Sequence, residues 1–171
     1  MRLTPVALAI ALAGLSVSTS LSGQRADTQI DPRSTALLQE GRAAASAGNL
    51  DRATDLIETA LAVDPRNRAA FLELASVASR QNLPGKAIRL YREALAIEPN
   101  DLTALRGQGE ALVQKGAMQA AKENLARIKT LCGKKPCPEA VTLATVIAKG
   151  PPPAPPSAEP AAKIPEATAS K

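Results

Sequence analysis

DLIETALAVDPRN, residues 55–67, recurs 34 residues later as RLYREALAIEPND, residues 89–101. Identical residues coincide at five places: Leu56 with Leu90, Ala60 with Ala94, Leu61 with Leu95, Ala62 with Ala96 and Pro65 with Pro99. A fixed period of 34 residues, built from helical hydrophobic patterns, is typical of a repeat solenoid whose stacked units share one continuous core. Such a fold presents an extended surface, so the sequence predicts a protein that binds a partner.

The two prolines set the register of the repeats. With each proline at position 32 of a unit, the three units begin at Ser34, Arg68 and Leu102. Tetratricopeptide repeats (TPRs) have small residues at positions 8 and 20, where the two helices of a unit cross most closely, and proline at the end. The residues at positions 8 and 20 are all small here: Gly41, Ala53, Ala75, Ala87, Gly109 and Ala121. Over residues 34–133 the chain resembles this family, which implies an all-α fold, a TPR α-solenoid of three helix-turn-helix repeats.

The third unit departs from the repeat pattern, as the last unit of a solenoid does. Ile128 replaces the alanine of position 27, and Gly133 replaces the closing proline. PEAVTLATVIAK at residues 138–149 then predicts a C-terminal capping helix that covers the apolar flank of this unit. A helix that dips into a membrane is the alternative. Together these patterns predict about seven helices and no strand in a TPR domain spanning residues 32–149.

Small side chains dominate the predicted core. Phe71 and Tyr91 are the only aromatic residues of the chain. In its first unit, Glu40 occupies the position at which the family pattern has leucine. We therefore expect the helices to lie close together, packed through alanine and leucine.

Residues 1–22 have the three regions of a secretory signal peptide. Arg2 supplies the positive charge, an uncharged apolar stretch follows from Val6 to Val17, and small residues lead to Ser22. Cleavage after residue 20 and cleavage after residue 22 both fit. We expect export across the inner membrane of a bacterium into the periplasm; the alternative is a membrane anchor formed by an uncleaved signal.

Cys132 and Cys137 flank the end of the third unit. In an oxidising compartment the pair predicts a structural disulfide that pins the turn before the last helix. The chain has no histidine, so its two thiols cannot complete a four-ligand zinc site or a haem-attachment motif. The cysteines also lack the two-residue spacing that is typical of redox-active pairs. A reactive or intermolecular pair is the alternative. We expect neither a metal nor a cofactor.

The formal net charge of +5 is unevenly distributed. Between residues 115 and 135 a single acidic residue, Glu123, accompanies six basic ones: Lys115, Lys122, Arg127, Lys129, Lys134 and Lys135. Such a basic patch attracts an acidic protein or lipid head groups, and a solvated face is the alternative. Nucleic acid is not expected as a partner, because export separates the chain from it and no aromatic residues interleave the basic ones.

Residues 150–171 differ in composition from the rest of the chain. They hold seven of the fourteen prolines and one large apolar residue, Ile164. The composition predicts a disordered Pro/Ala-rich tail, either merely solvated or used as a docking motif.

In the family that the chain resembles, the first helices of successive repeats line a concave groove. Residue by residue, the resemblance assigns partner binding to Leu38, Arg42, Leu72, Ser76, Arg80, Arg106 and Glu110. The three arginines suit an acidic segment or a C-terminal carboxylate. The carboxylate clamp of chaperone-binding members uses lysines and asparagines, which are replaced here by Leu38, Arg42, Glu73, Ser76, Thr103 and Gly107. Binding of chaperone tails is therefore not implied.

The sequence predicts a non-enzymatic interaction module or scaffold of the bacterial periplasm, which binds a peptide segment or a complex subunit rather than a small-molecule substrate. A chain without histidine, a nucleophile motif or paired acids beside glycine-rich loops offers no pattern for an enzyme. Two alternatives remain. One is a periplasmic redox or biogenesis factor that uses the cysteine pair, and the other is an envelope spacer that acts through its Pro-rich tail. Membrane contact is expected only through the basic patch or an uncleaved signal.

Overall fold

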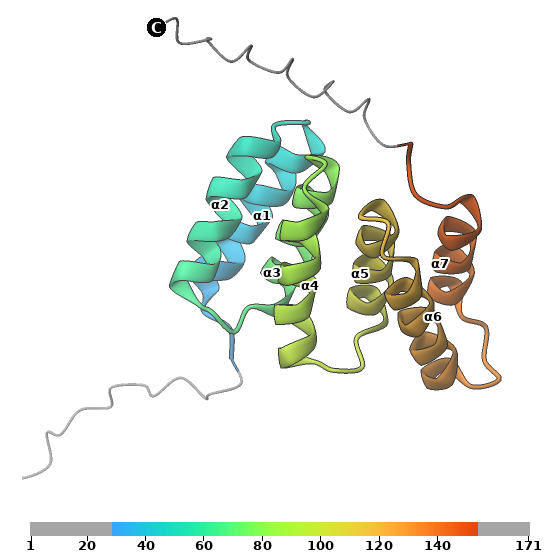
Figure 1. Cartoon of the computed structure of the whole chain (residues 1–171). Helices are drawn as coiled ribbons and strands as arrows, with labels where there is room; N and C mark the ends of the chain where they lie inside the picture. Colours follow the sequence, from blue (N-terminus) through green and yellow to red (C-terminus); the bar gives the residue numbers. More distant parts are fainter. Residues whose placement is uncertain (1–28, 154–171) are drawn as a thin grey trace, which may run out of the picture.

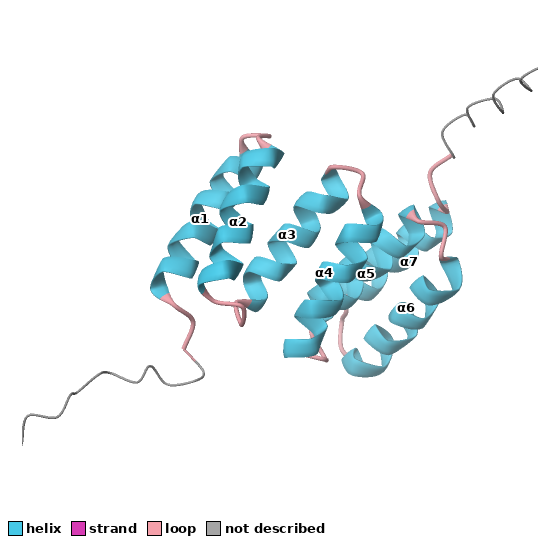
Figure 2. Ribbon diagram, turned by 60° about the vertical axis from the view of Figure 1, so that its left-hand side comes forward, coloured by secondary structure: helices cyan, strands magenta, loops and turns pink. Residues whose placement is uncertain are grey.

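The computed structural model describes residues 29–153, which form seven α-helices and, within that range, no strand (Figure 1). The helices are α1 (Pro32–Ser46), α2 (Leu50–Val63), α3 (Arg68–Arg80), α4 (Pro84–Ile97), α5 (Leu102–Gln114), α6 (Met118–Cys132) and α7 (Pro138–Lys149). Consecutive helices pair as α1 with α2, α3 with α4 and α5 with α6, and the pairs stack side by side (Figures 1 and 2). The predicted all-α TPR fold of three repeats and a capping helix is confirmed.

Local sequence signals explain where the helices begin. Asn49, Asn67 and Asp101 each accept a hydrogen bond from the backbone N–H three residues later, which satisfies a donor that the first turn leaves unpaired. Between helices of a pair, Gly48 and Asn82 adopt positive φ values of 82° and 59°, which glycine and asparagine tolerate best.

The core is built from small residues, as the sequence predicts. A Cβ on Gly41 would lie 2.5 Å from the Ile57 side chain of α2, so the first helical pair requires glycine at position 8. Gly109 occupies the same position in the third unit, but its close neighbour is on α7: a Cβ there would lie 2.6 Å from Leu143. The expectation that Gly109 serves the α5–α6 crossing is thus corrected, because the missing side chain makes room for the last helix.

Helix α7 covers the C-terminal end of the array. Its Leu143 is 0% exposed and forms a buried cluster with Leu105 of α5, Ile128 of α6 and its own Ala140. The predicted capping helix is confirmed. Among the described residues, no helix has the length and apolar character needed to cross a membrane.

A disulfide joins Cys132, the last residue of α6, to Cys137, which precedes α7. Both residues are half-buried and pack against the cluster around Leu143. The predicted pairing is confirmed, and its position ties the capping helix to the third repeat.

Reduction of the disulfide should loosen α7 before the rest of the domain. Closing so short a loop lowers the entropy of the unfolded chain and thereby stabilises the folded state by about 2 kcal/mol. The restraint acts on the segment between α6 and α7. We expect hydrogen exchange of α7 amides to accelerate at least tenfold after reduction, while α1 amides, at the other end of the array, stay unchanged. Equal exchange of α7 in the oxidised and reduced proteins would contradict this role.

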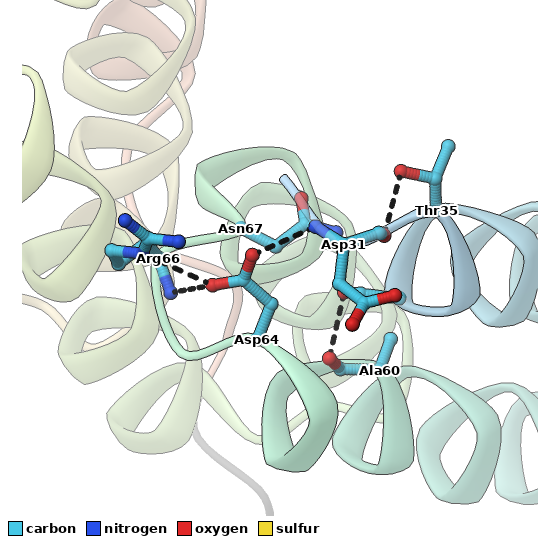
Figure 3. A network of polar contacts seen from close by, with 7 residues as sticks. Asp31, Thr35, Ala60, Asp64, Arg66 and Asn67 are labelled. Carbon is cyan, nitrogen blue, oxygen red and sulfur yellow. Dashed lines mark hydrogen bonds and ion pairs between the residues drawn. The ribbon is translucent and has the colours of Figure 1, made fainter. Parts of the chain in front are cut away.

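A buried polar network joins the first repeat to the second (Figure 3). The backbone N–H of Asp31 donates to Asp64 Oδ2 at 2.9 Å, and Asn67 Nδ2 donates to Ser34 Oγ at 2.8 Å. Ser34 Oγ in turn donates to the Ala60 carbonyl at 2.7 Å. One period later the corresponding residues of the next junction, Arg68 and Asp101, form an ion pair. Each junction is therefore held by the residue at position 1 of one repeat and the N-cap residue of the next repeat.

Acid should weaken the first junction through Asp64. Hydrogen bonds from the backbone N–H groups of Asp31 and Arg66 lower the pKa of this carboxyl below its ordinary value of 3.8. Because the unfolded chain takes up this proton first, the contribution is present above about pH 4 and is lost as pH falls through the lower folded pKa. We expect Asp64→Asn to flatten the fall in urea midpoint between about pH 5 and about pH 3. Asp55→Asn, at an exposed position, should leave the wild-type fall intact; equal profiles for all three proteins would refute the assignment.

Candidate functional site

The first helices of the repeats form the inner layer of the array. Helix α1 contacts α3, and α3 contacts α5, whereas α2 does not reach α4 and α4 does not reach α6. The array therefore curves with α1, α3 and α5 on the concave side and the second helices on the convex side. This layer is the groove in which the resemblance places partner binding.

The structure distributes the seven predicted groove residues unequally. Leu72, Ser76, Arg42, Arg106 and Glu110 are half-buried, and Arg80 is exposed. Leu38 is only 3% exposed, because it shares the buried face of α1 with Ser34, Gly41 and Ala45. The expectation that Leu38 lines an open groove is therefore corrected: it is a core residue and offers a partner almost no surface.

Two of the three predicted arginines already have a carboxylate partner. Arg42 Nε lies 3.1 Å from Glu73 Oε2, which links α1 to α3, and Arg106 Nη1 lies 2.7 Å from Glu110 Oε1 within α5. All four side chains are partly exposed, at 27% to 40%, so water and a ligand compete for these pairs. Arg80 makes no side-chain hydrogen bond or ion pair with the described part of the chain. The groove is thus close to neutral, with one unpaired guanidinium at the end of α3.

Tyr91 of α4 is a buried residue that contacts α5 beneath the inner layer, a contact that the sequence did not predict. The side chain is 7% exposed, and its ring and hydroxyl lie against Gly107 of α5. Burial, reinforced by Glu110 and opposed by Arg106, raises the pKa of Tyr91 to about 12, so the hydroxyl keeps its proton at neutral pH. The hydroxyl lies against α5, since a Cβ on Gly107 would be 2.5 Å from its oxygen. It makes no hydrogen bond with residues 29–153, which leaves a donor for a ligand.

The family model of the tetratricopeptide repeat matches residues 38–101 and 72–131, overlapping stretches that together cover more than half of the 171 residues. The chain is a tetratricopeptide repeat protein. No curated protein sequence matches it.

Solved structures resemble this tetratricopeptide repeat protein in fold. The TPR domain of Sgt2 from Aspergillus fumigatus has a TM-score of 0.64 and 22% identity, over 81% of this chain and 97% of that one. The first TPR domain of Spaghetti (RPAP3), bound to the HSP90 peptide SRMEEVD, has a TM-score of 0.62 and 21% identity, over 68% and 91%. PcrH from Pseudomonas aeruginosa has a TM-score of 0.61 and 18% identity, over 68% and 89%. Identities at this level show a shared fold.

The basic patch of this TPR protein lies away from the inner layer. Lys122, Arg127 and Lys129 project from α6, a second helix, and are exposed. Lys134 and Lys135 are exposed in the loop before α7, and Lys115 is exposed in the turn after α5. Arg127 Nη2 donates to the Pro99 carbonyl at 2.7 Å, so one of the six cations fastens the α4–α5 connection. A partner held by the groove and one held by the patch would therefore bind different faces.

Proposed function

We propose that this protein is a non-enzymatic interaction module of the bacterial periplasm that binds a peptide segment of another protein on the inner face of α1, α3 and α5. The observation that carries the proposal is the set of unsatisfied donors on that face. Guanidinium groups have five N–H donors, and the pairs with Glu73 and Glu110 leave most of those on Arg42 and Arg106 available. Arg80 and the Tyr91 hydroxyl add donors that have no partner within residues 29–153.

These donors suit a segment with acidic groups or exposed backbone carbonyls. Arg80, exposed and unpaired, would bind a carboxylate, while Tyr91 and the paired arginines would bind carbonyl oxygens along the segment. Two of the similar structures hold acidic chaperone peptides: the first TPR domain of RPAP3 with SRMEEVD and the second TPR domain of human RPAP3 with SGPTIEEVD. This likeness supports an acidic segment in general. Because the residues of the carboxylate clamp are replaced, it does not support a chaperone tail.

The periplasmic location rests on the sequence of residues 1–22, which lie outside the described residues, and is consistent with an oxidised cysteine pair. The same disulfide packs against the cap cluster, which favours a structural role over the alternative of a redox factor. Fractionation of the producing cell, with N-terminal sequencing of the protein, tests the location. We expect the mature chain in the periplasmic fraction, beginning after residue 20 or 22.

Site-specific photocrosslinking in the native compartment tests the binding face. A photoreactive residue at Ser76, on the inner face of α3, should crosslink a partner, whereas one at Ala96, exposed on the outer helix α4, should not. Replacing Arg42, Arg80 and Arg106 by alanine should then weaken binding of the identified partner at least tenfold, which corresponds to about 1.4 kcal/mol. Unchanged binding by this variant, together with loss of binding when Lys129, Lys134 and Lys135 are reversed in charge, would place the partner on the basic patch instead.

A further inference from the structure

The two ends of the described array differ. At the C-terminal end, α7 packs over α5 and α6. At the N-terminal end, α1 and α2 have no helix on their outer side within residues 29–153, and Figure 1 shows them at the opposite end from α7. The residues on that outer side indicate whether it is built to face water or to contact another surface.

The internal repeat identifies what the outer side is built to contact. Residues 34 positions later, on α3 and α4, are buried in a core cluster that they share with the first repeat: Leu74 at 2%, Val77 at 0%, Ala78 at 1% and Leu90 at 8% exposure. Their counterparts on α1 and α2 are Glu40, Ala43, Ala44 and Leu56. The outer side of the first repeat is thus the surface on which a further repeat would pack.

A hollow of about 400 Å³ lies on this surface, and it is lined largely by apolar side chains. Ala43, Ala44 and Ala47 of α1 and Leu56 of α2 form its apolar part. A solenoid end that faces only water usually carries polar residues, because it has no neighbour to bury an apolar surface. The hollow is large enough to receive side chains from a facing helix.

Opposite charges stand at the edge of the same hollow. Glu40 and Arg52 both line it, both are exposed, and neither side chain makes a hydrogen bond or ion pair with residues 29–153. The residue one period after Arg52 is Lys86, whose Nζ lies 2.9 Å from Glu58 Oε1 of the preceding repeat. Arg52 therefore occupies the position of a junction cation but has no carboxylate partner within residues 29–153.

We propose that this outer face of α1 and α2 is a homodimer interface, in which two copies meet about a two-fold axis through the hollow. A surface that carries both charges beside one apolar hollow is self-complementary, since a two-fold rotation brings Glu40 of each copy to Arg52 of the other. The apolar lining of the hollow, Ala43, Ala44, Ala47 and Leu56, is then removed from water in both copies. The dimer presents two concave grooves, so a partner with two binding segments would gain avidity. The inference does not depend on which partner the groove binds.

The size of the face sets the expected strength. Helices of 15 and 14 residues are about 22 Å long, and side by side they offer a face roughly 20 Å across. Such a face is smaller than that of a stable specific interface and falls in the range of weak, transient complexes, so we expect a dimer no tighter than micromolar. Sedimentation equilibrium should be measured on the purified protein in the processed form that the cell yields. The average mass should rise from that of one copy to that of two as the concentration increases from about 1 μM to about 500 μM.

Charge reversal separates this geometry from other ways of associating. Glu40→Arg and Arg52→Glu should each leave the protein monomeric over the whole concentration range, because each places two like-charge pairs at the interface. An equimolar mixture of these two variants should form a heterodimer, detected by native mass spectrometry, since each basic side chain of the first variant then meets an acidic side chain of the second. Glu93→Arg, the same change at an exposed position of α4, should dimerise like the wild type.

Three results would overturn the proposal. The first is a wild-type protein that is monomeric at every concentration, as expected if residues 1–28 or another protein cover the face. The second is a dimer that survives both single reversals, which would place the interface elsewhere. The third is a mixture of the two variants that stays monomeric although circular dichroism shows both to be folded.

Discussion

Ala87→Trp should destabilise the domain by about 3 kcal/mol or more, a large share of the roughly 5–15 kcal/mol that small domains have. Ala87 is position 20 of the second repeat, is 0% exposed, and belongs to the same buried cluster as Ala75 and Ala78 of α3. An indole there has no space unless α4 moves away from α3. Since the second repeat contacts both of its neighbours, that displacement disturbs the whole array.

Ala96→Trp is the matched control for this prediction. Ala96 lies on the same helix but is exposed, so the same substitution should change stability by no more than about 0.5 kcal/mol. Urea unfolding followed by far-UV circular dichroism measures both. Similar midpoints for the two variants would mean that the packing face of α4, and with it the repeat register, is wrong.

The parts of the fold that the sequence predicts correctly depend on neighbouring residues. An asparagine before a helix, a glycine in a two-helix turn and a proline after a helix act within a few residues. Asn49 accordingly caps the start of α2, Gly48 forms the turn before it, and Pro65 follows its end. The disulfide belongs to the same class, because Cys132 and Cys137 end and precede consecutive helices and their Cα atoms are 6.0 Å apart.

The predictions that needed correction depend on how each helix is rotated about its axis. Position 5 of a repeat can face the groove or the core, and in α1 the rotation that buries Ser34 and Ala45 buries Leu38 as well. Gly109 likewise meets Leu143 of α7, whereas Gly41 at the same position of the first repeat meets Ile57 of its own helix pair. Sequence periodicity identifies the residues of a face but not the neighbour that the face meets.

The candidate site contains one contact that the repeat pattern could not reveal. Arg42 and Glu73 are 31 residues apart, three short of the period, so they are not equivalent positions of successive repeats. They meet because curvature brings α1 and α3 together on the concave side. A charge count along the predicted groove would have shown Glu73 and Glu110 beside three arginines, but not which arginine remains unpaired.

Gly107→Ala should destabilise the domain by about 2 kcal/mol, although alanine is the better helix former by about 1 kcal/mol. A Cβ at position 107 would lie 2.5 Å from the Tyr91 hydroxyl oxygen and 2.7 Å from its Cε1. The ring is 7% exposed and packed between α3, α4 and α5, so it cannot swing aside without opening the groove floor. Gly85→Ala, at a position on α4 with no atom within 4 Å, should instead be neutral or slightly stabilising.

A double-mutant cycle locates the cause of that loss. In a Tyr91→Ala background the ring is absent, so Gly107→Ala should lose its penalty and stabilise the helix as Gly85→Ala does. The coupling between positions 91 and 107, measured from urea midpoints, should then exceed about 1 kcal/mol. If Gly107→Ala costs the same in both backgrounds, the close approach of α5 to Tyr91 does not set the requirement for glycine. The position of the Tyr91 hydroxyl against α5, on which part of the proposed binding face depends, would then be wrong as well.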